Sequence, residues 1–274
     1  MKLKPILSAI ALPLLWILSI TIFAALPFSP LGNYKWVVFG IICSLIAWGL
    51  TYMFLKFDGL SFSQIGLTWQ SDTFKKFFIG CLLGIAIAII VLGIVVLFTD
   101  LTIERNAITN NPLTIFWLLL FIPLSFMEEL AFRGYAFIKL NKAIGPRLTL
   151  IITSIIFAYY HDATGATFLT QLLGPGIWGI IYGLAAIWSD GIALPTGLHA
   201  AVNVVQAFFG MKPDKYQSAI WEIDFPTAMT DAMQAHTEIV GMSVQLLLLA
   251  FGIFLTEWYL RKRKKQTTNK YYNI

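Results

Sequence analysis

The sequence has little charge, few cysteines and few histidines. Of its 274 residues, only 12% are Asp, Glu, Lys or Arg, whereas soluble domains carry roughly 25%. This shortage excludes an ordinary soluble enzyme, a disordered chain and a basic nucleic-acid-binding domain. The two cysteines, Cys43 and Cys81, both lie in apolar stretches, so neither a disulfide framework nor a thiolate zinc site is indicated.

Long apolar runs are abundant instead. Hydrophobic residues make up 58% of the chain, and the mean hydropathy is +0.77. A helix needs about 20 apolar residues to cross the hydrocarbon core of a bilayer. The runs therefore predict an all-α polytopic membrane helix bundle of about eight transmembrane helices. The predicted spans are Ile6–Ala25, Trp36–Leu55, Phe77–Phe98, Leu113–Leu140, Leu148–Tyr160, Leu172–Ser189, Ile192–Gly210 and Ile239–Leu260.

Three of these spans are expected to be irregular. The fifth is short for a full crossing, and the sixth and seventh are joined by a very tight turn. Such segments can be tilted, broken or partly re-entrant where protein surrounds them. The first span could be a secretory signal, with Met1–Lys4 as its charged start and Phe23-Ala24-Ala25 as a loose cleavage site. Its apolar run exceeds the roughly 7–15 residues of a signal-peptide core, so a retained helix is the favoured interpretation.

The charges of the loops predict the orientation. Basic residues gather at the N-terminus, after the second and fourth spans, and in the tail run 261–265, whereas acidic residues dominate the loops after the third and seventh spans. Basic loops stay on the cytoplasmic side. We therefore expect both termini to be cytoplasmic. Because the chain is short, we also expect the membrane to be a bacterial cell membrane.

Three charges interrupt the fourth predicted span. Glu128, Glu129 and Arg133 stand in an otherwise apolar stretch, where each unpaired ion would cost about 2.5–3.5 kcal/mol near the bilayer centre. Glu129 precedes Arg133 by four residues, the favourable order for an ion pair on one helix face. This pair could equally be a structural lock within a helix bundle. Glu128 points about 100° away around the helix and is a candidate general base.

Two of the three histidines also lie in predicted spans. His161 ends the fifth span, in Phe157-Ala-Tyr-Tyr-His161, and His199 lies in the seventh, four residues before Asn203. Residues at this spacing share one helix face, so His199 and Asn203 can converge on one group. Each histidine alone could simply hydrogen-bond to a neighbouring helix. Two histidines, an asparagine and a carboxylate pair on three helices together indicate a functional site.

These residues resemble the three ordered motifs of a known family. Glu128-Glu129-x-x-x-Arg133, Phe157-x-x-x-His161 and His199-x-x-x-Asn203 are similar to those of the CPBP intramembrane proteases. That family includes the CAAX prenyl endopeptidases and the Abi-type proteins that process bacteriocins or confer immunity to them. The resemblance spans about Leu113 to Gly210, and the flanking segments resemble nothing further.

The resemblance implies a glutamic intramembrane endopeptidase without a metal or other cofactor. By analogy, Glu128 would activate water with the help of His161, and His199 and Asn203 would stabilise the oxyanion. Glu129 and Arg133 would orient the helix and tune Glu128, and Phe157 would pack within its motif. The expected organisation is N-terminal transmembrane helices at 1–110, a catalytic core at 111–210, and an extracytoplasmic loop, last helix and basic tail at 211–274. These three parts would form one integral membrane domain.

Three alternatives stay open at this stage. Glu and His side chains can also bind zinc, so a zinc-dependent peptidase is possible, although the chain has no His-Glu-x-x-His. A non-catalytic scaffold or bacteriocin-immunity protein could use the same buried ions for assembly. A transporter with a proton relay is less favoured, because no inverted repeat is visible. The expected partners are a peptide or membrane-protein substrate and the lipid bilayer, but no nucleic acid, and the sequence does not indicate the oligomeric state.

Overall fold

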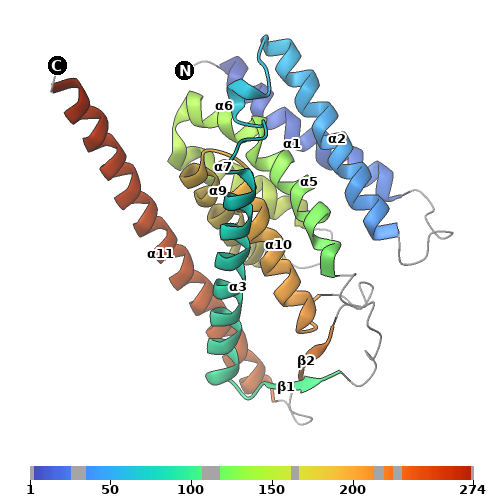
Figure 1. Ribbon diagram of the computed structural model, residues 1–274. Coiled ribbons are helices and arrows are strands. Elements are labelled where there is room, and N and C mark those ends of the chain that lie inside the picture. Colours follow the sequence, from blue (N-terminus) through green and yellow to red (C-terminus); the bar gives the residue numbers. More distant parts are fainter. Residues whose placement is uncertain are drawn as a thin grey trace.

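The computed structural model describes residues 3–25, 35–106, 118–161, 167–212, 219–224 and 230–272. These residues form a helical bundle in which the N- and C-termini lie at the same end, while a small two-stranded sheet lies at the opposite end (Figure 1). The beginning of the fourth predicted span, 113–117, lies outside the described residues.

Five helical segments are long and apolar enough to cross a membrane. They are α1 (Leu3–Ala24), α2 (Lys35–Asp58), α3 (Thr73–Leu97), the segment Phe168–Ser189, and the part Asp231–Lys262 of α11 (Asp231–Tyr272). They coincide with the first, second, third, sixth and eighth predicted spans. Many large apolar side chains on them are exposed, as expected for surfaces that face lipid. The chain is therefore an integral membrane protein.

The prediction of one continuous fourth span is wrong in the part that the structure describes. The chain there forms α5 (Phe121–Arg133) and α6 (Tyr135–Ile144), and the helix breaks at Gly134, whose φ and ψ are −75° and −125°. The hydroxyl of Tyr135 and the ammonium of Lys139 both donate to the Asp58 carboxylate at the end of α2. These bonds hold α6 against the end of α2.

The fifth and seventh predicted spans are also short helices. α7 (Pro146–Tyr160) has 15 residues and α10 (Ala193–Phe208) has 16, fewer than the roughly 20 that a full crossing needs. The sixth span is irregular, as predicted: α8 (Phe168–Gln171) leads into a π-helical turn, η4 (Leu172–Gly176), and then into α9 (Ile177–Ser189). Pro175 lies inside this turn and has no N–H to donate to the helix.

The sheet was not predicted. β1 (Thr102–Arg105) follows α3 and pairs antiparallel with β2 (Trp221–Asp224), which follows α10, so that Ile103 lies opposite Ile223. β2 falls in the predicted loop after the seventh span, of which 213–218 and 225–229 lie outside the described residues. The sheet joins the chain after α3 to the chain after α10.

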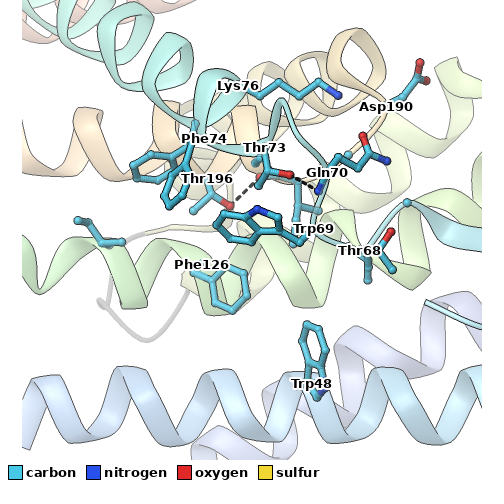
Figure 2. A pocket seen from close by; sticks show the side chains of 17 residues that line it. Trp48, Thr68, Trp69, Gln70, Thr73, Phe74, Lys76, Phe126, Asp190 and Thr196 are labelled. Atoms are coloured by element: carbon cyan, nitrogen blue, oxygen red, sulfur yellow. Dashed lines mark hydrogen bonds between the residues drawn. The ribbon is translucent and has the colours of Figure 1, made fainter. Parts of the chain in front are cut away.

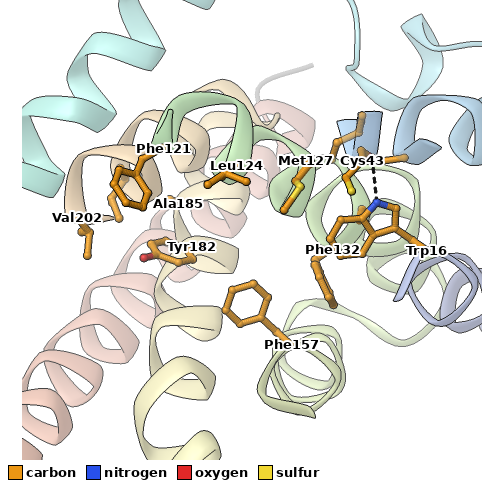
Figure 3. Close-up of a cluster of buried hydrophobic side chains, with 14 of the residues drawn as sticks. Trp16, Cys43, Phe121, Leu124, Met127, Phe132, Phe157, Tyr182, Ala185 and Val202 are labelled. Atoms are coloured by element: carbon orange, nitrogen blue, oxygen red, sulfur yellow. Dashed lines mark hydrogen bonds between the residues drawn. The ribbon is translucent and has the colours of Figure 1, made fainter. Parts of the chain in front are cut away.

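An apolar core fills the space between α1, α5, α7, α9 and α10 (Figure 3). Trp16 of α1 is fully buried, and its Nε1 donates to the carbonyl of Cys43 on α2 at 3.1 Å. Phe132 of α5 lies edge-on between Trp16 and Phe157 of α7, with ring centroids 5.8 and 5.1 Å away. The first helix is thus packed against the helices that carry the candidate site residues.

α3 and α10 approach each other backbone to backbone. A Cβ on Gly80 would lie 2.2 Å from the carbonyl oxygen of Leu194, and one on Gly197 would lie 2.0 Å from that of Phe77. Small residues permit such close helix packing in membranes. The glycines therefore determine how closely α10, with His199 and Asn203, is held against α3.

Gly197→Ala is expected to lower the stability of the fold by about 1–3 kcal/mol, because the added methyl group overlaps backbone that has no room to move. Gly49→Ala is the matched control, since no atom lies within 4 Å of a Cβ at that position. Thermal unfolding of the two variants purified in the same detergent measures the difference. Equal melting temperatures would contradict the packing described for α3 and α10.

Candidate active site

The candidate site centres on an imidazole between two carboxylates. α5 supplies Glu128 and Glu129, and α10 supplies His199. His199 Nδ1 lies 2.8 Å from Glu129 Oε1, and His199 Nε2 lies 3.7 Å from Glu128 Oε2. All three residues are buried, with exposed fractions of 9% for Glu128, 0% for Glu129 and 4% for His199. Two helices distant in sequence thus bring their ionisable groups together inside the bundle.

Arg133 stabilises the more deeply buried carboxylate. Its Nη1 donates to Glu129 Oε1 at 3.2 Å, so the i, i+4 ion pair expected from the spacing forms. Its Nη2 donates to the carbonyl of Gly179 on α9 at 2.8 Å. The guanidinium also lies 4.5 Å from the ring centroid of Phe157. Arg133 therefore connects the site to α9 and α7 while balancing the charge of Glu129.

His161 lies at the C-terminal end of α7. Its Nδ1 is 2.8 Å from the carbonyl oxygen of Phe157, and its ring centroid is 4.6 Å from that of Phe157. The ring is close enough to Glu128 for an electrostatic interaction between the two. α7 thus brings His161 towards the same carboxylate that His199 faces from α10.

Asn203 follows His199 by one helical turn on α10. Its Nδ2 donates to Ser125 Oγ on α5 at 3.2 Å. Because α5 and α10 run in opposite directions, Asn203 meets α5 about one turn before the residue pair Glu128–Glu129. The side chain is therefore on the same face as His199, and its described hydrogen bond goes to a serine that the sequence interpretation did not include.

Two tyrosines at the site were also missed. The Tyr160 hydroxyl donates to Glu128 Oε1 at 3.4 Å, and the Tyr182 ring stacks on His199 with centroids 4.2 Å apart and planes 17° apart. Tyr160 directly precedes His161, and Tyr182 lies between Gly179 and Gly183. Glycines at this spacing indicate a close approach of helices, and that signal could have pointed to Tyr182.

The two carboxylates retain acceptor capacity. Glu128 Oε2 and Glu129 Oε2 are buried and accept no hydrogen bond from the described residues. Buried polar atoms are rarely left without a partner, so Glu128 Oε2, which faces His199 Nε2, is suited to accept a proton from a bound molecule. Lys212, which follows α10, adds positive charge near this carboxylate. Burial lowers the pKa of Lys212 to about 8, and the charge of Glu128 acts in the opposite direction.

Within the described ranges, no group of three or more His, Cys, Asp and Glu side chains has an arrangement that could hold a metal ion. The buried ionisable groups are instead joined to one another: His199 and Arg133 both bind the same oxygen of Glu129. The arrangement is a hydrogen-bonded ionic cluster with one carboxylate, Glu128, less tightly bound than the other.

A cavity of about 540 Å³ lies between α2, α3 and the helix pair α5 and α10, and the residues of the cluster are not among those that line it (Figure 2). Aromatic side chains from several elements line it, among them Trp48, Trp69, Phe74 and Phe126. Phe126 precedes Glu129 by three residues on α5, and the lining residue Thr196 precedes His199 by three on α10. The helices that carry the cluster therefore also form part of the cavity wall.

Comparison with known protein families identifies the central part of the chain. Residues 110–205 match the family described as type II CAAX prenyl endopeptidase Rce1-like, and no curated protein matches the chain. The matched segment contains Glu128, Glu129, Arg133, His161, His199 and Asn203. The chain is thus an integral membrane protein whose residues 110–205 form a domain of the Rce1-like type II CAAX prenyl endopeptidases, a family of proteases.

Proposed function

We propose that the protein is an intramembrane endopeptidase that hydrolyses a peptide bond with water activated by Glu128. The observation that carries this proposal is the buried cluster in which His199 lies between Glu128 and Glu129. Ionisable groups are costly inside a membrane protein and commonly mark its functional site. Membership of a protease family supports hydrolysis over a purely structural use of the same ions.

The proposed reaction begins with Glu128 as the general base. Glu128 Oε2 takes a proton from water, and the hydroxide oxygen forms a bond to the carbonyl carbon of the scissile peptide. His161, from the end of α7, helps to position the water. When the C–N bond breaks, Glu128 returns the proton to the leaving amine. A positioned acid–base group of this kind typically contributes about 10²–10⁴-fold in rate.

His199 and Asn203 are proposed to stabilise the oxyanion. His199 Nδ1 is committed to Glu129, so an N–H at Nε2 requires the doubly protonated imidazole. Asn203 Nδ2 would turn from Ser125 to the oxyanion as the second donor. In this assignment Glu129 and Arg133 position His199, and Phe157 packs against both Arg133 and His161.

The membrane arrangement forms part of the same proposal. The termini lie at one end of the bundle (Figure 1), as eight crossings with both ends in the cytoplasm of a bacterial cell require. The short helices α7 and α10 and the broken α5–α6 segment would complete their crossings inside protein, where irregular backbone is tolerated. Residues 111–210 would then form the catalytic core between the flanking parts 1–110 and 211–274. The substrate would be a peptide or membrane protein that reaches the site from the cytoplasm or from lipid.

The direct test is cleavage by the purified chain in liposomes. The probes are a quenched fluorescent peptide that ends in a farnesylated CAAX sequence and a library of unmodified quenched peptides. Wild-type protein is expected to cleave at least one probe, and Glu128→Gln is expected to cleave none at a comparable rate. Absence of cleavage of every probe by folded wild-type protein would refute the proposal in favour of a scaffold or immunity role.

Removal of divalent metal distinguishes the proposed mechanism from a zinc-dependent one. Dialysis against a strong chelator is expected to leave the cleavage rate within twofold of the untreated enzyme, because the proposed base and oxyanion donors are side chains. The rate is measured before dialysis, after it, and after addition of zinc. Loss of activity that zinc alone restores would establish the metal-dependent alternative.

A further inference from the structure

Tyr160 occupies a variable position of the Phe157-x-x-x-His161 motif, and its side chain contacts the proposed general base. Its hydroxyl donates to Glu128 Oε1 at 3.4 Å, whereas Glu128 Oε2 faces His199 Nε2 at 3.7 Å. The two oxygens of one carboxylate therefore have different neighbours. One meets a neutral donor from α7, and the other meets the imidazole from α10.

Aromatic packing determines where the Tyr160 hydroxyl points. The ring lies 5.3 Å from Trp16 of α1, 5.8 Å from Phe132 of α5 and 4.8 Å from His161, measured between centroids. Trp16 is itself fully buried and bonded to the Cys43 carbonyl. Tyr160 is thus held between the first helix and the helix that carries Glu128.

We propose that Tyr160 is a positioning residue for Glu128, supported from α1 by Trp16: its hydroxyl holds Oε1 and leaves Oε2 directed at the water to be activated. This inference rests on the proposed function, in which Glu128 is the general base. It extends the site beyond residues 110–205, because Trp16 lies outside the segment that matches the protease family. The bond is long, at 3.4 Å; catalytic hydrogen bonds are often long without substrate and tighten when it binds.

The physical effect of the hydroxyl has a definite sign. A hydrogen bond donated to a carboxylate favours its charged form, and the charged form is the one that can act as a base. Removing the hydroxyl should therefore make Glu128 hold its proton to a higher pH. The other titratable groups near Glu128 are unchanged in such a variant: they are Glu129, Arg133, His161, Tyr182, His199 and Lys212.

The test compares Tyr160→Phe with Tyr159→Phe. The control removes the hydroxyl from the adjacent tyrosine, whose side chain is 57% exposed. Protonation of Glu128 is followed by infrared difference spectroscopy on protein in liposomes, using the carboxylic acid band that Glu128→Gln eliminates. In Tyr160→Phe this band is expected to persist to a pH about one unit higher than in wild type, which corresponds to about 1.4 kcal/mol. Tyr159→Phe should match wild type.

Activity provides a second measurement on the same variants. With the library peptide that wild type cleaves fastest, the acid limb of the kcat profile of Tyr160→Phe should move to higher pH, while KM stays within twofold. An infrared titration identical to that of wild type would overturn the role of Tyr160, even if Glu128 proves essential. Full activity of Glu128→Gln would instead refute the proposed function, and the infrared comparison would still decide whether Tyr160 acts on Glu128.

Discussion

Replacing Glu128 by glutamine is expected to lower kcat for peptide cleavage by about 10²–10⁴-fold, the contribution typical of a general base. Glutamine has nearly the same shape but cannot accept the proton of water at the reacting oxygen. The fold should tolerate the change, because the ion pair of Glu128 with His199 Nε2 is long, at 3.7 Å. The measurement is the initial cleavage rate in liposomes at saturating peptide, together with the melting temperature.

Glu104→Gln is the matched control for this substitution. Glu104 lies on β1 with an exposed side chain, far along the chain from the buried cluster. The control should retain wild-type kcat and KM. A folded Glu128→Gln variant that keeps more than one tenth of the wild-type kcat would show that another group activates the water.

Replacing Arg133 by methionine is expected to destabilise the protein by about 3–5 kcal/mol, because removing one partner of a buried ion pair leaves the other charge uncompensated. The side chains of Arg133 and Glu129 are both 0% exposed. The loss should be measured as a change in the free energy of unfolding in detergent micelles. Activity should fall with it, since Glu129 also binds His199.

Two further variants separate charge from packing. The double variant Glu129→Gln, Arg133→Met removes both charges, so it should be more stable than Arg133→Met alone. Arg147→Met breaks an exposed pair with Glu257 and should change stability little, because solvent screens such pairs. If Arg133→Met lowered the free energy of unfolding no more than Arg147→Met does, the buried ion pair between Arg133 and Glu129 would contribute nothing to the stability of the fold.

The parts of the site that depend on local spacing could be predicted from the sequence. Glu129 and Arg133 lie four residues apart on one helix, so their pairing requires only helix geometry. The placement of His199 on the same helix face as Asn203 follows from the same rule. Their meeting with α5 depends on tertiary packing, and only the combination of rare polar residues in apolar spans indicated it.

Other features depend on contacts that no short pattern encodes. The break at Gly134 is followed by the bonds of Tyr135 and Lys139 to Asp58, a residue on a distant helix. The strands β1 and β2 have four residues each, too few for an alternating pattern to stand out, and their partners are far apart in the chain. In the sequence, Tyr160 cannot be distinguished from the other aromatic residues of its span. Its ring contacts with Trp16 and Phe132, which orient the hydroxyl, become visible only in the structure.

The close packing of α3 against α10 has a consequence for local unfolding. Gly80 and Gly197 leave no layer of side chains between the two backbones, and the β1–β2 pairing joins the segments that follow them. Neither helix can separate without exposing the amides and carbonyls of both, so the two should exchange their amide hydrogens as one cooperative unit. Motions that admit a substrate would then have to come from the remaining helices, moving around this fixed pair.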